Sequence, residues 1–251
     1  MKIDILIPTR GDMDNLAACI GGLIAHIETD HYITLRIFPP EWEPTPQVIA
    51  LLEIIRRRGH GVSIEIQDPA RVGNLALIRR QSFVNNADVV LSLDDDIILA
   101  SIHHNPIERL ADKVLHNQVS FAVPIIRYVQ NFTDKVSKRG HTEIWEKVAV
   151  SDYRLRIATA VYGDDWIRVY DIGRDTPIKV LGGSCFCLKG ATANQLALNE
   201  NIKTYGFEDI DISLALWDMA GVKGIATPDV YAYHFGYWSN QKWTENAIQI
   251  D

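Results

Sequence analysis

Short apolar runs alternate with segments of helical periodicity along the first half of the chain. Three of the runs have the length of strands and lie at residues 3–8, 32–38 and 88–93, and residues 62–67 alternate apolar and polar positions like a further strand. Three segments between or after them repeat their apolar residues with the spacing of helices and lie at about 14–28, 45–58 and 74–86. Strands separated by helices need crossover connections, so the pattern predicts an α/β fold with a mainly parallel sheet flanked by helices.

Capping residues mark the ends of two predicted helices. Asp12 or Asp14 is expected to cap the first helix, because a side-chain oxygen can accept the free amide protons of a first turn. Thr45 followed by Pro46 predicts the start of the second helix, and Gly59 predicts its end. The first part of the chain, to about residue 125, therefore has well-defined element boundaries.

The pattern is less regular in the second half of the chain. "GGSCFCLKG" at 182–190 predicts a short strand framed by glycines, and 207–221 has the spacing of a helix. "GIATPDVYAYHFG" at 224–236 predicts a final strand. Because no repeat or low-complexity linker separates the halves, we expect one domain, 1–251, with an elaborated second half, 126–251.

The composition excludes some function classes. The formal net charge of −7 argues against a nucleic acid as a stable partner, since such proteins usually carry a basic face. No apolar run reaches 18 residues, and Asp4 interrupts the apolar start, so neither a spanning helix nor a signal peptide is expected. The three cysteines are odd in number and fit a reduced compartment. We expect a soluble cytoplasmic protein, or one peripheral to a membrane.

Three adjacent carboxylates, Asp94, Asp95 and Asp96, follow the almost continuously apolar run at 88–93, which is typical of a strand covered on both faces. Ligands of open α/β sheets bind outside the carboxyl ends of the strands. Neighbouring buried carboxylates repel one another, and a divalent cation removes that cost because Mg²⁺ and Mn²⁺ prefer oxygen ligands. The position therefore favours a metal-binding turn, with a solvated acidic turn as the alternative.

Four segments of the chain, in this order, resemble the GT-A glycosyltransferases of the family-2 type, which use nucleotide-diphosphate sugars. They are "ILIPTRGD", "VGNLALIRRQSF", "LSLDDDII", which looks like the Asp-x-Asp motif, and "YGFEDIDISLAL". The resemblance runs from Ile3 to about His234 and implies a GT-A, Rossmann-like fold. It also implies a metal-dependent enzyme in which 1–125 binds the nucleotide sugar and 126–251 binds the acceptor and catalyses sugar transfer to an acceptor hydroxyl.

The resemblance implies roles for individual residues. Asp96 would bind Mn²⁺ or Mg²⁺, and His234, at the end of the last strand, would complete the metal's coordination; a core histidine bonded to backbone is the alternative. The nucleotide sugar would be bound by Pro8, Thr9, Arg10, Asp68, Arg79, Asp94, Asp95, Gly182 and Gly183. Arg79 and Arg80 cannot both face the site, because helix neighbours diverge by about 100°. A surface ion pair is the alternative for each arginine, and a plain turn is the alternative for the two glycines.

The Glu-Asp pair in "YGFEDIDISLAL" would carry the catalysis. An inverting transfer needs a base for the proton of the acceptor hydroxyl, and by position in the pair this is Asp209, while Glu208 would hydrogen-bond the acceptor. Acidic residues are also favoured in a first helical turn by the dipole alone. In a retaining enzyme these two residues would instead position the substrate, and the metal site would be unchanged.

The chain departs from the family pattern after the second strand. Acidic residues usually stand there, whereas this chain reads "FPPEWEPT", so Glu41, Glu43 or Asp68 is a candidate substitute and the nucleotide base stays open. A nucleotidyltransferase acting on a sugar phosphate is a second hypothesis, but its Gly-x-Gly-x-Arg loop is missing from "PTRGDMDN". A binding module with a dead site is a third.

The acceptor and the oligomeric state stay open. A glycan, a lipid-linked sugar, a small molecule or a modified base could each serve as acceptor. The weakly patterned segment 127–179 is where we expect acceptor choice to be determined, because loops on a rigid scaffold carry specificity.

Overall fold

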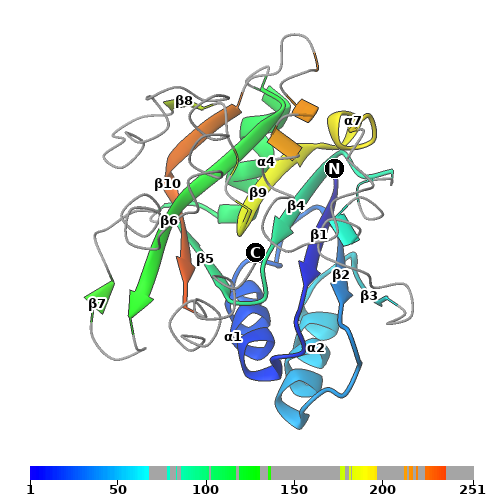
Figure 1. Cartoon of the computed structure of the whole chain (residues 1–251). Helices are drawn as coiled ribbons and strands as arrows, with labels where there is room; N and C mark the ends of the chain where they lie inside the picture. Colours follow the sequence, from blue (N-terminus) through cyan, green and yellow to red (C-terminus); the bar gives the residue numbers. More distant parts are fainter. Residues whose placement is uncertain are drawn as a thin grey trace, which may run out of the picture.

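A computed structural model of the chain describes a defined set of residues. They are 1–67, 78–79, 83, 86–101, 103–116, 119–130, 135–136, 176–178, 181, 183–196, 212–213, 215–216, 219 and 224–235. Figure 1 shows a central curved sheet with helices packed against it. Among the described residues, no helix has both the length and the apolar character needed to cross a bilayer.

The elements expected in the first half of the chain are confirmed. They are β1 (Lys2–Pro8), α1 (Met13–Ile24), β2 (Tyr32–Phe38), α2 (Pro46–Arg58), β3 (Val62–Ile66) and β4 (Val89–Leu93). Of the helix expected at 74–86, the described residues Ile78, Arg79 and Phe83 are helical. Asn86 lies in a bend, and the other residues of that segment lie outside the described part of the chain.

The part of the chain after β4 adds further strands to the same sheet. The elements are β5 (Ile97–Ser101), α4 (Pro106–His116), β6 (Phe121–Gln130), β7 (Lys135–Val136), β8 (Thr176–Ile178), β9 (Cys185–Lys189), α7 (Gly190–Ala193) and β10 (Gly224–His234). β9 and β10 confirm the strands expected at 182–190 and 224–236. Within the helix expected at 207–221, the described Ile212, Ser213, Ala215 and Leu216 are helical, whereas Met219 lies in a bend.

The strand order in the sheet is β3-β2-β1-β4-β9-β6-β10-β5. β3, β2, β1 and β4 pair in parallel, as do β6 and β10. β9 is antiparallel to both β4 and β6, and β5 is antiparallel to β10. Six of these eight strands therefore point the same way, which confirms a mainly parallel sheet. β7 and β8 extend it beside β6 and β10.

Apolar side chains cover both faces of the sheet. On one face, the buried leucines, isoleucines and valines of α1, α2 and α4 form one apolar cluster with residues of β1, β2, β4, β5, β6, β9 and β10. On the other face, Leu6, Val90 and Phe186 pack with Ile78 and Phe83 and with Ile212 and Leu216. All five residues of β4 are buried as a consequence, as expected of a strand covered on both sides.

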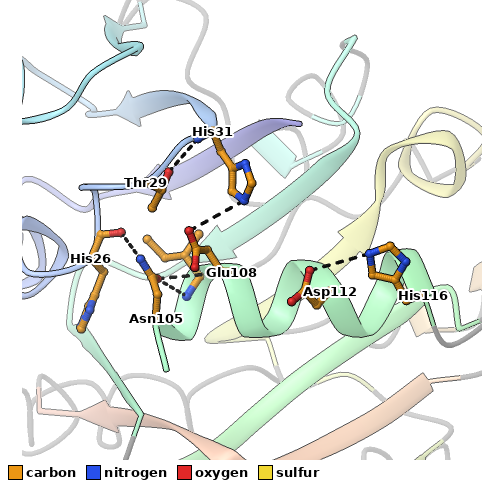
Figure 2. Close-up of polar contacts among 8 residues, drawn as sticks. His26, Thr29, His31, Asn105, Glu108, Asp112 and His116 are labelled. Atoms are coloured by element: carbon orange, nitrogen blue, oxygen red, sulfur yellow. Dashed lines mark hydrogen bonds and ion pairs between the residues drawn. The ribbon is translucent and has the colours of Figure 1, made fainter. Parts of the chain in front are cut away.

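Side-chain caps fix the starts of the helices. Asp12 accepts the amide protons of Asp14 and Asn15 at the start of α1, and Thr45 accepts that of Val48 at the start of α2. At the start of α4, the Asn105 side-chain oxygen accepts the amide protons of Ile107 and Glu108, and the side-chain nitrogen has a partner of its own. Figure 2 shows its amide nitrogen donating to the His26 carbonyl oxygen, 2.6 Å away, which ties α4 to the turn after α1.

Two adjacent glycines in the last turn of α1 provide a stability test. A Cβ at Gly21 would have no neighbour within 4 Å, whereas a Cβ at Gly22 would lie 3.0 Å from Cγ2 of Ile98 in β5. We expect Gly21→Ala to raise the free energy of unfolding by about 0.5–1 kcal/mol, through helix propensity. Gly22→Ala should lose that gain because Ile98 must move. Urea unfolding of both variants measures this, and equal gains would contradict the close packing of α1 on β5.

Candidate metal and nucleotide site

The three aspartates form a tight turn between β4 and β5. The Ile97 amide donates to the Asp94 carbonyl oxygen at 3.2 Å, which closes the turn. The Asp94 amide donates in turn to the Ser184 carbonyl oxygen at 2.9 Å, just before β9. The turn therefore lies at the carboxyl end of a central strand, where the sequence analysis expected it.

Asp96 and His234 meet at this turn although 138 positions separate them in the sequence. β5 and β10 pair as an antiparallel ladder in which Ile97 lies opposite His234. The Phe235 amide donates to the Asp96 carbonyl oxygen at 3.0 Å and extends this ladder. His234 Nε2 lies 3.0 Å from Asp96 Oδ2, and both side chains are only 13% exposed. The two residues predicted as metal ligands are thus in direct contact.

The second carboxylate oxygen of Asp96 suits a cation. Oδ1 is buried and has no hydrogen-bond partner among the described residues, which is costly for a charged oxygen. Burial opposes ionisation of Asp96, but the charge and hydrogen bond of His234 outweigh it and lower the pKa of the carboxyl. Across the described residues, no group of three or more His, Cys, Asp or Glu side chains is placed to hold a metal. Asp96 and His234 would therefore supply two ligands and leave the others to phosphate oxygens and water.

Arg79 contacts Asp94 rather than facing solvent. Its Nη2 lies 3.0 Å from Asp94 Oδ1 and also donates to the Gly183 carbonyl oxygen. The guanidinium is 1% exposed and lies over the ring of Phe186, 5.3 Å from its centroid. Burial raises the pKa of Asp94, the Arg79 charge lowers it, and Asp96 raises it further. Arg79 thus partly neutralises the turn and ties it to the segment before β9.

Asp95 is bound by the loop that follows β1. Its Oδ2 accepts the Arg10 amide proton at 3.3 Å, and the Thr9 hydroxyl also hydrogen-bonds this carboxyl. Thr9 directly follows Pro8, the last residue of β1, and its amide donates to the Phe38 carbonyl oxygen. Burial raises the pKa of Asp95 to about 6, although the bond from Thr9 lowers it. The structure therefore brings Pro8, Thr9 and Arg10 together with the aspartate turn.

The raised pKa of Asp95 predicts a dependence of stability on pH. An ordinary Asp ionises near pH 3.9, so between about pH 4 and pH 6 the folded protein binds more protons at Asp95 than the unfolded chain does. This carboxyl therefore makes the protein less stable as the pH rises through that window. As the pH rises from 4 to 7, the free energy of unfolding of Asp95→Asn should increase relative to that of the wild type, by on the order of 3 kcal/mol in all. Urea unfolding at several pH values tests this, and parallel curves would contradict it.

Several predicted site residues lie outside the described part of the chain: Asp68, Gly182, Glu208 and Asp209. Glu41 and Glu43, the candidate substitutes for the family's acidic residues, are exposed in the loop after β2.

Cys19 contacts the turn without having been predicted to do so. Its Sγ donates to the Asp94 carbonyl oxygen at 3.7 Å, and the thiol is buried. Burial, and after it the charges of Asp95 and Asp96, raises the pKa of Cys19, so the thiol stays protonated. In the sequence it had the pattern of an ordinary core residue of α1.

No protein-family model and no curated protein matches this sequence. Among solved structures, this chain is similar to that of GalNAc-T7 with UDP, GalNAc and Mn²⁺, with a TM-score of 0.57 and 14% identity. The similarity covers 94% of this chain, which spans less than half of that protein's chain, 44%. At this identity the likeness concerns the fold. Together with the strand order and the aspartate turn after β4, it shows that this chain has a GT-A-type fold.

Proposed function

We propose that this chain is a metal-dependent glycosyltransferase that moves a sugar from a nucleotide-diphosphate sugar to an acceptor hydroxyl. One observation carries the proposal: Asp96 and His234 converge at 3.0 Å at the carboxyl end of the sheet, and the remaining Asp96 oxygen is buried with no hydrogen-bond partner in the described part of the chain. The other aspartates have different partners, Arg79 for Asp94 and the β1 loop for Asp95. This division of roles leaves Asp96 as the carboxylate available for a cation.

The residues of the turn would each contribute to donor binding. Asp96 and His234 would hold a divalent cation, whose chemistry is to neutralise the charge on the departing nucleoside diphosphate. Arg10 brings a positive charge that acts on both Asp95 and Asp96, and it would contact the phosphates from the β1 loop. Arg79 is fully buried against Asp94, so its role would be to orient that carboxylate. Thr9 and Pro8 would line the nucleoside side of the site.

The mechanism that we propose is inverting. Asp209 would take the proton from the acceptor hydroxyl as it attacks the anomeric carbon, and Glu208 would hydrogen-bond the acceptor. Their support is the resemblance of "YGFEDIDISLAL" to the acceptor-side motif of family-2-type enzymes. The anomeric configuration of the product, read by NMR, distinguishes this mechanism from a retaining one.

The similar GalNAc-T7 structure contains UDP and Mn²⁺, which makes uridine the first base and Mn²⁺ the first metal to test. An imidazole ligand also favours a first-row ion such as Mn²⁺ over Mg²⁺. The acceptor would be chosen by the segment 127–179.

The test is release of nucleoside diphosphate from a panel of UDP-, GDP- and dTDP-sugars, with Mn²⁺, Mg²⁺ or EDTA. Water can replace the missing acceptor, so slow hydrolysis of the right donor is expected, and EDTA should stop it. Asp112→Asn on α4 is the control for preparation effects, since Asp112 pairs only with His116 among the contacts described for it. Release that is insensitive to EDTA, or equal for every sugar, would argue against the proposal.

A further inference from the structure

One face of α1 lies along the chain segment that carries Asp96. Cys19 and Gly22 are spaced i and i+3 and so lie on one side of α1, and His26 follows in the turn after the helix. Cys19 Sγ donates to the Asp94 carbonyl oxygen, Gly22 packs against Ile98, and His26 Nε2 donates to the Leu99 carbonyl oxygen at 3.2 Å. The three residues thus contact the same chain segment, 94–99, at three successive points.

These contacts lie at residues 94, 98 and 99, on both sides of Asp96, so they can fix the position of the backbone that carries its carboxylate. β5 is an edge strand and pairs only with β10 among the described strands, so its second edge has no ladder of its own. Figure 1 shows β5 beside β10, to which it is antiparallel, with the start of β5 near α1. A Cβ on Gly22 would already crowd Ile98, so glycine at this position allows the close approach of helix and strand. The stripe formed by Cys19, Gly22 and His26 is referred to below as the α1 rail.

We propose that the α1 rail positions the aspartate turn, and that Cys19, Gly22 and His26 are positioning residues for the metal pair Asp96–His234. The Asp94 carbonyl oxygen receives two donors, the Ile97 amide within the turn and the Cys19 thiol from the helix. The thiol contact holds the Asp94–Asp95 peptide in one orientation and so directs the next carboxylate, Asp96, towards β10. This inference rests on the proposed function, since it assigns the rail to that site.

The test compares two rail variants with two matched controls. Cys19→Ala removes the thiol donor, and Gly22→Ala moves Ile98. Cys187→Ala truncates a thiol that is equally buried and whose pKa is raised by burial. Gly21→Ala adds the same methyl group to the same helix in open space. Cys19→Ser keeps a hydrogen-bond donor at the first position.

Two measurements are made on each protein. The first is hydrogen exchange in the ligand-free protein, over the peptide that contains the turn and β5. The second is the affinity for Mn²⁺ with UDP, from the shift of the thermal midpoint that both produce together. We expect both rail variants to exchange faster at the turn and to bind about two- to tenfold more weakly, while the controls match wild type. Cys19→Ser should retain more affinity than Cys19→Ala.

The outcomes separate the two proposals. If the rail variants exchange like the controls, or Cys187→Ala loses as much affinity as Cys19→Ala, the positioning role is overturned. If the rail variants alone exchange faster but wild type binds no metal or nucleotide, the rail still positions the turn and the proposed function fails. If Cys19→Ala and Cys187→Ala lower the thermal midpoint of the ligand-free protein equally, that decrease reports lost packing, and the positioning role is judged from the exchange rate and the affinity alone.

Discussion

Asp96→Asn should abolish metal-dependent nucleotide binding while the protein stays folded. The substitution keeps the size of the side chain but removes the charge, and the amide can no longer serve as the anionic ligand beside His234. Changes to groups that merely support a metal ligand typically cost about 10–100-fold in affinity, so loss of the ligand itself should cost about 100-fold or more. Titration of Mn²⁺ in the presence of UDP, followed by the electron paramagnetic resonance of the free ion, measures the change.

Asp112→Asn on α4 is the matched control for Asp96→Asn. It makes the same chemical change at an exposed position, 54% accessible, and should bind Mn²⁺ like wild type. Circular dichroism of both variants checks that the fold survives. Near-normal Mn²⁺ binding by Asp96→Asn would contradict the metal assignment, and the aspartate turn would then have to be regarded as a structural acidic turn.

Asp209→Asn should retain donor binding but lose turnover. Removing a general base typically lowers the rate by about 10²–10⁴-fold, because the proton of the acceptor hydroxyl then has no acceptor in the transition state. Donor affinity should change little, since this residue would act on the acceptor side. Turnover with saturating donor and the Mn²⁺–UDP affinity, measured on the same preparation, separate the two effects.

Asp211→Asn is the control for Asp209→Asn, since it alters a carboxylate two positions further along the same segment. It should leave turnover within a few-fold of wild type. If Asp209→Asn turns over at a normal rate and Glu208→Gln does not, the base is Glu208. If neither variant is slow, a retaining route is favoured, and the anomeric configuration of the product must then match that of the donor.

Local sequence patterns were sufficient for the parallel half of the sheet. β1, β2 and β4 are short, mostly apolar runs, β3 alternates apolar and polar residues, and the caps Asp12 and Thr45 act as their residue types predict. Gly59 ends α2 as expected, but its backbone is extended, with φ −81° and ψ 103°. Glycine is needed there because a Cβ would lie 2.2 Å from Cγ2 of Val62. The position of the helix end was predictable, and the physical reason for it was not.

Long-range pairing explains what the sequence could not predict. "IILAS" directly after the aspartates is a strand only because β10 pairs with it, and β10 lies far along the chain. The 3.0 Å contact of Asp96 with His234 follows from that pairing, whereas in the sequence it rested on a family resemblance. The contact of Cys19 with the turn had no local signal, because a cysteine on the buried face of a helix has the same pattern whether it packs or donates.

The central claim is a metal-dependent nucleotide site at the aspartate turn, and thermal stability of the wild-type chain tests it most directly. The midpoint would be measured with a panel of nucleoside diphosphates and nucleotide sugars, each with Mn²⁺, Mg²⁺ or EDTA. A ligand that binds only the native state raises stability according to its concentration relative to Kd. We predict a shift for one nucleotide and its sugars, present with Mn²⁺ and absent with EDTA. A folded protein whose midpoint does not move with any of them, or moves equally in EDTA, would contradict the claim.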